Sequence, residues 1–140
     1  MNSNPVRSIL AVLAGFVVLS FVAQVMELAL AGTVSGGDVA GYEEYFAVMN
    51  RPAMQAARLG AYVVAAVLGG YVAARVAGLA EMPHALAAAA LQVLTLLGGM
   101  TGEYGAFTPR WLWAALIVGT VPAMLLGAAV RARARRAGTA

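Results

Sequence analysis

Cysteine, lysine and charge are what this sequence has least of. The 140 residues contain no cysteine, which excludes disulfides, thiolate metal ligands and cysteine nucleophiles. A single histidine, His84, is too few for a multi-histidine metal or haem site. All nine basic residues are arginine, and charged residues make up only 11% of the chain, against about 25% in an ordinary soluble domain. We therefore expect neither a metal nor a cofactor.

Apolar residues are what the sequence has in abundance. They make up 62% of the chain, and the mean hydropathy is +0.82. A soluble domain of this size buries only about 60–70% of the surface that its unfolded chain exposes, so it could not hide so many apolar side chains. The composition excludes a soluble domain and a disordered segment, and it indicates that the lipid bilayer is the partner of most of this chain.

Four segments are long and apolar enough to cross a bilayer, which takes about 20 residues in a helix. Backbone polar groups in lipid must be paired within their own segment, which favours helices. We predict an all-α, integral membrane four-helix bundle in a single domain (residues 1–140). It is either a left-handed bundle or two packed antiparallel hairpins. The predicted helices are 6–31, 53–79, 83–100 and 110–131.

The first apolar segment has an alternative interpretation, as a secretory signal peptide. Arg7 precedes it, and Ala29-Leu30-Ala31 at its end is typical of the cleavage site of a secretory signal peptide. Its apolar run, however, is longer than the run of about 7–15 residues that signal peptides carry. We therefore expect this segment to stay in the protein as a spanning helix.

The arginines predict the orientation, because cytoplasmic loops carry an excess of basic residues. With the N-terminus inside, six arginines lie in the cytoplasm and three outside, so both termini are predicted to be cytoplasmic. The heavy use of Ala, Gly and Arg without Lys indicates a bacterial protein and hence the inner membrane. The cytoplasmic set is Arg7, Arg75, Arg131, Arg133, Arg135 and Arg136, and the outer set is Arg51, Arg58 and Arg110.

The connection 32–52 is the only long one. It opens with a flexible, turn-rich stretch at 33–38. Apolar residues then recur at helical spacing, which predicts either a short amphipathic helix at 39–49 on the outer membrane surface or an ordered loop. Asn50 is expected to be the N-cap of the next helix, with Pro52 in its first turn.

A basic tail is predicted after the last span. Its arginines should attract anionic lipid headgroups, at about 1 kcal/mol each near the surface. The alternative is that they act only as a stop-transfer and topology signal. The four residues are Arg131, Arg133, Arg135 and Arg136.

Small residues recur every fourth position on two of the predicted helices. Helices in lipid associate through such faces because the backbones can approach closely. We predict that both faces are contact surfaces, either within one chain or between chains. The residues are Ala66, Gly70, Ala74 and Gly78 on the second helix, and Ala115, Gly119, Ala123 and Gly127 on the fourth.

Glu27 is the one acidic residue inside a predicted span, and Gln24 lies one turn away on the same face. Glu27 sits about 10 Å outward from the middle of the first span, from a rise of 1.5 Å per residue. Arg58 begins the second span at a similar depth and is its best partner, with Arg51 second. A charge in a span indicates a proton- or cation-coupled site, and the alternative is a structural ion pair.

Further polar side chains lie at comparable depth in three of the helices. Gln92 is near the middle of the third helix, with Thr95 one turn away, and Ser20 and Thr120 lie in the first and fourth. We expect them to form a layer of hydrogen bonds between helices, each worth about 0.6–2 kcal/mol.

No catalytic constellation can be assembled from this sequence, so we expect a protein that is not an enzyme and does not bind nucleic acid. The leading hypothesis is a structural or accessory membrane protein that packs, through its Gly/Ala faces, against itself or a larger complex. The alternative is a small transporter or channel that uses Gln24, Glu27 and Gln92. A lipid-directed enzyme that uses outer acids is the third possibility.

Overall fold

The computed structural model describes residues 4–35, 41–103 and 105–138. Five α-helices and one short 3-10 helix account for most of this part of the chain, so the all-α prediction is confirmed. The elements are α1 (Pro5–Ser35), α2 (Tyr42–Met49), α3 (Pro52–Ala77), α4 (Glu81–Thr101), η1 (Gly105–Phe107) and α5 (Arg110–Ala137).

Helices α1, α3, α4 and α5 are each long and apolar enough to cross a membrane, which confirms the prediction of four such helices. Their outward faces carry large apolar side chains; Phe21 is 68% exposed and Val118 is 74% exposed. Such surfaces are unfavourable in water and suit hydrocarbon. The structure therefore suggests a multi-pass membrane protein.

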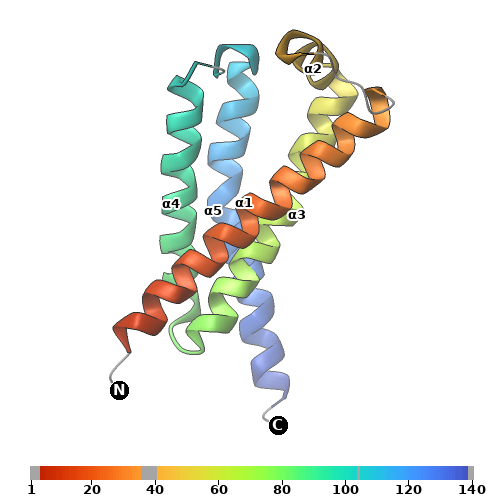
Figure 1. Ribbon diagram of the computed structural model, residues 1–140. Coiled ribbons are helices and arrows are strands. Elements are labelled where there is room, and N and C mark those ends of the chain that lie inside the picture. Colours follow the sequence, from red (N-terminus) through yellow and green to blue (C-terminus); the bar gives the residue numbers. More distant parts are fainter. Residues whose placement is uncertain (1–3, 36–40, 104, 139–140) are drawn as a thin grey trace.

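Helix α3 is at the centre of the arrangement. Its contacts with α1 and with α5 are the two most extensive contacts between described helices. The start of α1 and the end of α5 lie at the same end of the molecule, here called the terminal end (Figure 1). Helix α2 and η1 lie at the opposite end, here called the α2 end. Towards the α2 end, α1 and α3 diverge from α4 and α5 (Figure 1).

Two glycines set the crossing of α3 with α5. A Cβ atom added to Gly70 would overlap the carbonyl oxygen of Met124 in α5. In the same way, a Cβ atom on Gly127 would overlap the carbonyl oxygen of Val67 in α3. The two backbones are therefore in direct contact, as small residues permit in lipid-embedded helices.

Gly69, which precedes Gly70 in α3, allows the close crossing of α3 with α1. A Cβ atom on Gly69 would lie 2.7 Å from the carbonyl oxygen of Gly15, and one on Gly15 would lie 2.9 Å from the carbonyl oxygen of Gly69. The pair Gly69-Gly70 thus lets α3 contact one helix on each side. Gly119, by contrast, has no described atom within 4 Å of the place where its Cβ would stand.

The connection between α1 and α3 differs from the sequence-based expectation. Helix α1 continues to Ser35, so the stretch 33–35 is helical rather than a turn. The predicted turn residues 36–38, and Val39 at the start of the expected amphipathic helix, lie outside the described residues. A helix does follow, but it covers only Tyr42–Met49.

Asn50 is not the N-cap of α3, as the sequence pattern predicted. Arg51 occupies the N-cap position and Pro52 is the first helical residue. The Asn50 side chain instead donates from Nδ2 to the backbone oxygen of Phe107, 2.7 Å away. Phe107 also stacks on Phe46, with ring centroids 5.1 Å apart. These contacts tie α2 to η1 across the α2 end of the molecule.

The expected basic tail is part of α5, which runs to Ala137. Alanine and arginine are among the best helix formers, so the helix continues to its C-cap, Gly138. Arg135 donates from Nη1 to the backbone oxygen of Gly78 (2.8 Å), and its Nε lies 3.4 Å from a carboxylate oxygen of Glu81. These bonds fasten the end of α5 to the connection between α3 and α4.

Candidate functional site

The structure brings Glu27 of α1 and Arg58 of α3 together. Nη2 of Arg58 lies 2.8 Å from Oε1 of Glu27, and the two side chains are 12% and 28% exposed respectively. Both residues lie between the glycine crossing of α1 with α3 and the α2 end. The result is an ion pair held inside the part of the molecule formed by the apolar helices, where Coulomb attraction is stronger than in water.

Tyr45 of α2 completes this cluster. Its hydroxyl donates to the same Oε1 of Glu27 at 2.5 Å. Burial, and next the bonded carboxylate, raise the pKa of Tyr45, while Arg58 opposes the shift. The hydroxyl is therefore protonated at neutral pH and serves as a donor. The carboxylate is held by a guanidinium and a phenol at once.

Tyr45→Phe is expected to loosen α2 and to cost about 1–2 kcal/mol, because a hydrogen bond to a charged acceptor is lost. Since the folded-state pKa is raised above the ordinary value of about 10, the contribution of this bond is complete below pH 10 and declines as the pH rises through the folded-state pKa. Hydrogen exchange of the α2 amides measures the loosening. Tyr71→Phe is the control, since no partner of its hydroxyl is found among the described residues; equal exchange in both variants would contradict the expectation.

A second polar layer lies deeper, towards the middle of the helices. The Ser20 hydroxyl of α1 donates to Oε1 of Gln92 in α4 at 3.1 Å. The Thr120 hydroxyl of α5 donates to the backbone oxygen of Leu116 at 2.7 Å, so its bond with Tyr62 of α3 at 2.8 Å has the tyrosine as donor. The Ser20–Gln92 bond thus links α1 to α4, and the Tyr62–Thr120 bond links α3 to α5.

Sequence reasoning named Ser20, Gln92 and Thr120 for this layer and missed Tyr62. Thr95, which it also named, is exposed and donates to the backbone oxygen of Leu91 in its own helix at 3.0 Å. Tyr62 lies one helical turn after Arg58, so both side chains lie on the same face of α3. This four-residue spacing is the feature of the sequence from which Tyr62 could have been predicted.

A small cavity separates the two layers. Its volume is about 30 Å³, and it is lined by Ala23, Glu27, Arg58, Ala61, Tyr62 and Leu116. A water molecule needs about 10–15 Å³ by this measure, so the cavity has room for one or two. Nη1 of Arg58 is buried and has no hydrogen-bond partner among the described residues. A polar guest in this cavity would supply an acceptor.

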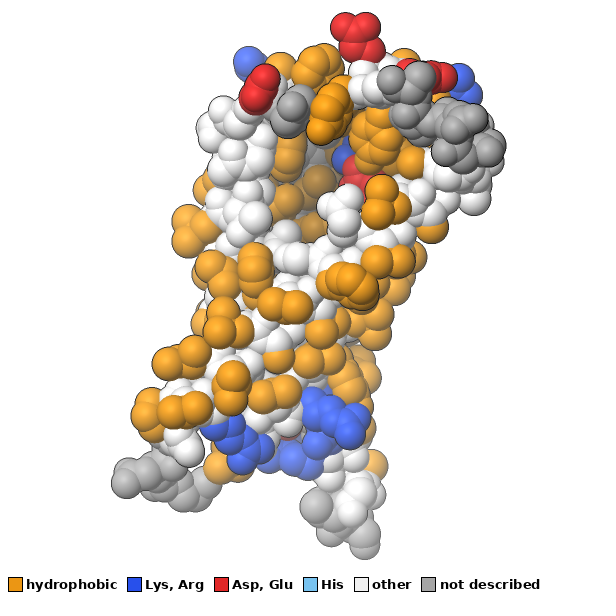
Figure 2. Space-filling view, in the orientation of Figure 1, with side chains coloured by type: hydrophobic (Ala, Val, Ile, Leu, Met, Phe, Trp, Pro, Cys, Tyr) orange, Lys and Arg blue, Asp and Glu red, His pale blue; other side chains and the backbone are white. Residues whose placement is uncertain are grey.

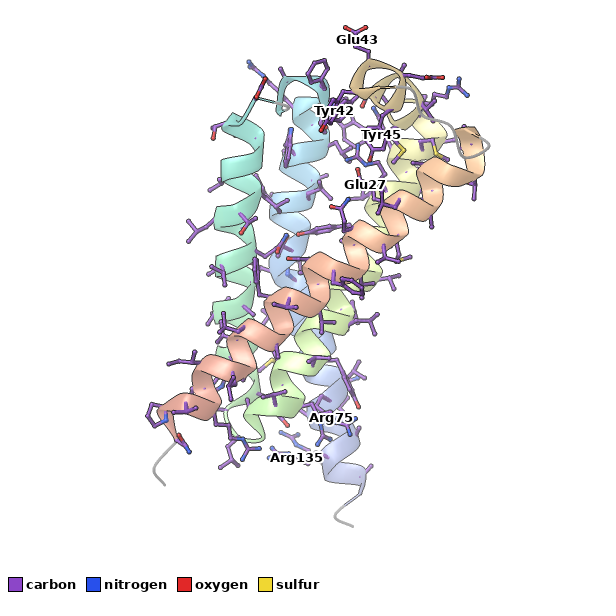
Figure 3. The ribbon with its side chains drawn as sticks, in the orientation of Figure 1. Glu27, Tyr42, Glu43, Tyr45, Arg75 and Arg135 are labelled. Atoms are coloured by element: carbon purple, nitrogen blue, oxygen red, sulfur yellow. The ribbon has the colours of Figure 1, made fainter. Side chains whose placement is uncertain are left out.

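The site is open on the face drawn in Figure 2, near the α2 end. Figure 2 shows a hollow there in which an acidic and a basic side chain lie together beneath the rim. Figure 3 places Tyr42 and Tyr45 above Glu27, whereas Glu43 points away from the molecule. An open groove of about 410 Å³ runs beside the pair, lined by Gln24, Leu28, Gly41, Tyr42 and Tyr45.

The remaining predicted site residues lie elsewhere. Gln24 is exposed and lines the groove, while Arg51 is exposed at the start of α3. His84, whose Nδ1 lies 2.7 Å from the backbone oxygen of Ala80, belongs to the start of α4 at the terminal end. Across residues 4–35, 41–103 and 105–138, no group of three His, Cys, Asp or Glu side chains is arranged to hold a metal ion.

The cluster formed by Glu27, Arg58 and Tyr45 is thus the one place where predicted site residues, a cavity and an opening coincide within the described chain. No protein-family model matches this chain, and neither a curated protein nor a solved structure matches it.

Proposed function

We propose that this chain is a multi-pass protein of a bacterial inner membrane, with both termini in the cytoplasm and α2 on the outside. The support is the distribution of charge between the two ends. The terminal end carries six arginines and one acid, Glu81, which is buried against Arg135. The positive-inside rule assigns such an end to the cytoplasm.

The second part of the proposal is that the outer half binds a small polar or charged solute, without enzymatic chemistry. The observation that carries it is the Glu27–Arg58 pair at the floor of a hollow near the α2 end. A buried pair is weak evidence for stability, because its desolvation offsets much of the attraction. Ionised groups within spans are functional candidates by default.

The geometry favours entry from the half of the molecule nearer the α2 end. Between the polar layers and the terminal end, α3 is in backbone contact with α1 at Gly69 and with α5 at Gly70. A solute with a charged group would replace either Glu27 or Arg58 as the ionic partner of the other residue. The hydrogen bond from the Tyr45 hydroxyl to Glu27 would be kept or broken as the solute binds. In a small transporter built on this site, the conformation described here would be the outward-open state.

An accessory or self-associating role is the second candidate. The glycine faces that motivated it are used inside the chain, because Gly70 and Gly127 lie at the crossing of α3 with α5. The observation that still favours it is the exposure of α1: only 17% of the residues in its most apolar 18-residue stretch are buried, against 44% in that of α3. Its exposed apolar face would meet either lipid or another membrane protein.

Purification from the native membrane in mild detergent, followed by native mass spectrometry, tests the proposal. We expect the wild-type protein to carry a small-molecule adduct that Glu27→Gln loses. Glu43→Gln, an exposed carboxylate on α2, should keep it. A companion protein at fixed stoichiometry would favour the accessory role, and a protein without any adduct would contradict solute binding.

A further inference from the structure

An apolar groove between α1 and α4 lies at the terminal end of the molecule, here called the α1–α4 groove. Its volume is about 410 Å³. The surface inside it is almost wholly apolar, and its polar side chains are Ser8 and His84. The lining residues are Ser8, Ile9, Val12, Leu13, Pro83, His84 and Ala87.

A fixed arginine lies beside this groove. Arg7 directly precedes the α1 wall of the groove, and its Nε donates to the backbone oxygen of Val76 at 2.8 Å. Its Nη2 also lies over Gly78, where any side chain would collide with it. The guanidinium is thereby held at the connection between α3 and α4, from which the other groove wall starts. Its two terminal nitrogens have no partner among the described residues.

The charge of the surroundings is of one sign. Arg7 shares the terminal end with five other arginines, and Glu81, the acid described there, is only 6% exposed and lies against Arg135. Figure 2 shows basic side chains gathered at this end, immediately beyond the apolar surface. A ligand at this end therefore meets a positive surface next to an apolar groove.

We propose that the α1–α4 groove binds an anionic phospholipid of the inner leaflet. One acyl chain lies along Ile9, Val12 and Ala87, and the phosphate pairs with the terminal nitrogens of Arg7. Ser8 and His84 stand at the polar rim. Charge complementarity selects this occupant, because basic pockets between spanning helices on the cytoplasmic side hold anionic headgroups. The site differs from the α5 arginines that the sequence pattern singled out, and it is independent of the Glu27–Arg58 cluster.

Lipid binding measured by native mass spectrometry tests this site. The purified full chain is titrated with phosphatidylglycerol or with phosphatidylcholine in detergent. We expect phosphatidylglycerol to bind more tightly, and Arg7→Gln to weaken it about five- to tenfold, from roughly 1 kcal/mol or slightly more per arginine. Arg75→Gln is the matched control, since it removes the same charge from the same end outside the groove; it should change binding less than about twofold on the same scale.

A second variant keeps the test decisive if Arg7→Gln disturbs the end of α3. Ala87→Trp fills the groove without touching Arg7, and Ala87 is exposed, so the fold should tolerate it. We expect this variant to lose preferential phosphatidylglycerol binding as well. Equal binding of the two lipids, equal losses in Arg7→Gln and Arg75→Gln, or unchanged binding in Ala87→Trp would each overturn the proposal.

Discussion

Gly70→Ala is expected to separate α3 from α5 and to lower the free energy of unfolding by at least about 3 kcal/mol, near the upper range for overpacking. The added methyl group would overlap the carbonyl oxygen of Met124, which is a backbone atom and cannot rotate away as a side chain would. Gly127→Ala should behave alike, because it meets Val67 in the same way. Reversible unfolding in detergent micelles measures the loss.

Gly119→Ala provides the control for this prediction. It lies on the same helix and in the same four-residue repeat as Gly127, yet no described atom is within 4 Å of its Cβ position. Replacing a glycine inside a helix by alanine favours the helix by about 0.5–1 kcal/mol, so no loss is expected. Equal destabilisation by Gly70→Ala and Gly119→Ala would show that the α3–α5 contact is not where the structure places it.

Glu27→Gln is expected to produce the second large effect, a loss of about 2–3 kcal/mol. Removing one member of a buried pair leaves the other charge uncompensated, which costs about 3–5 kcal/mol when both are fully buried. The lower figure applies because Glu27 is 28% exposed. The remaining guanidinium of Arg58 would then lie in an apolar interior with a neutral partner.

The double variant Glu27→Gln/Arg58→Gln isolates the interaction free energy between the two side chains from the effects that each change has on its other neighbours. Since no charge is left behind, we expect it to be less destabilised than the sum of the two single changes, with a coupling above about 1 kcal/mol. Glu43→Gln and Arg51→Gln, both exposed at the α2 end, form the matched cycle and should show no coupling. Additive losses at Glu27 and Arg58 would contradict a direct interaction.

The four long helices could be predicted because each segment alone satisfies the length and hydropathy that a bilayer demands. The ends of those helices were less well predicted. Helix α5 continues through its arginines to Ala137, since composition marks where lipid stops and not where helical hydrogen bonding stops. The junction at Asn50 differs for another reason: its side chain is recruited by Phe107, 57 residues away.

For the candidate site, the sequence predicts how deep a polar residue lies in its span, but not which side chains of other helices it contacts. Glu27 and Arg58 lie at similar depth on consecutive spans, so they could be matched from the sequence. Tyr45 and Tyr62 were missed, because their roles depend on which faces of α2, α3 and α5 turn inward. The two repeats of small residues show the same limit: periodicity identifies a helix face, whereas tertiary packing decides that Gly127 is in contact and Gly119 is not.

Topology in intact cells tests the central claim, that four helices cross the membrane with the arginine-rich terminal end inside. Because the chain has no cysteine, each single-cysteine variant carries only the thiol that was introduced, so labelling of this chain reports that position alone. We predict that a membrane-impermeant maleimide labels Glu43→Cys in intact cells, and Ala137→Cys only after permeabilisation. Labelling of Ala137→Cys from outside intact cells, with Glu43→Cys protected, would contradict the account.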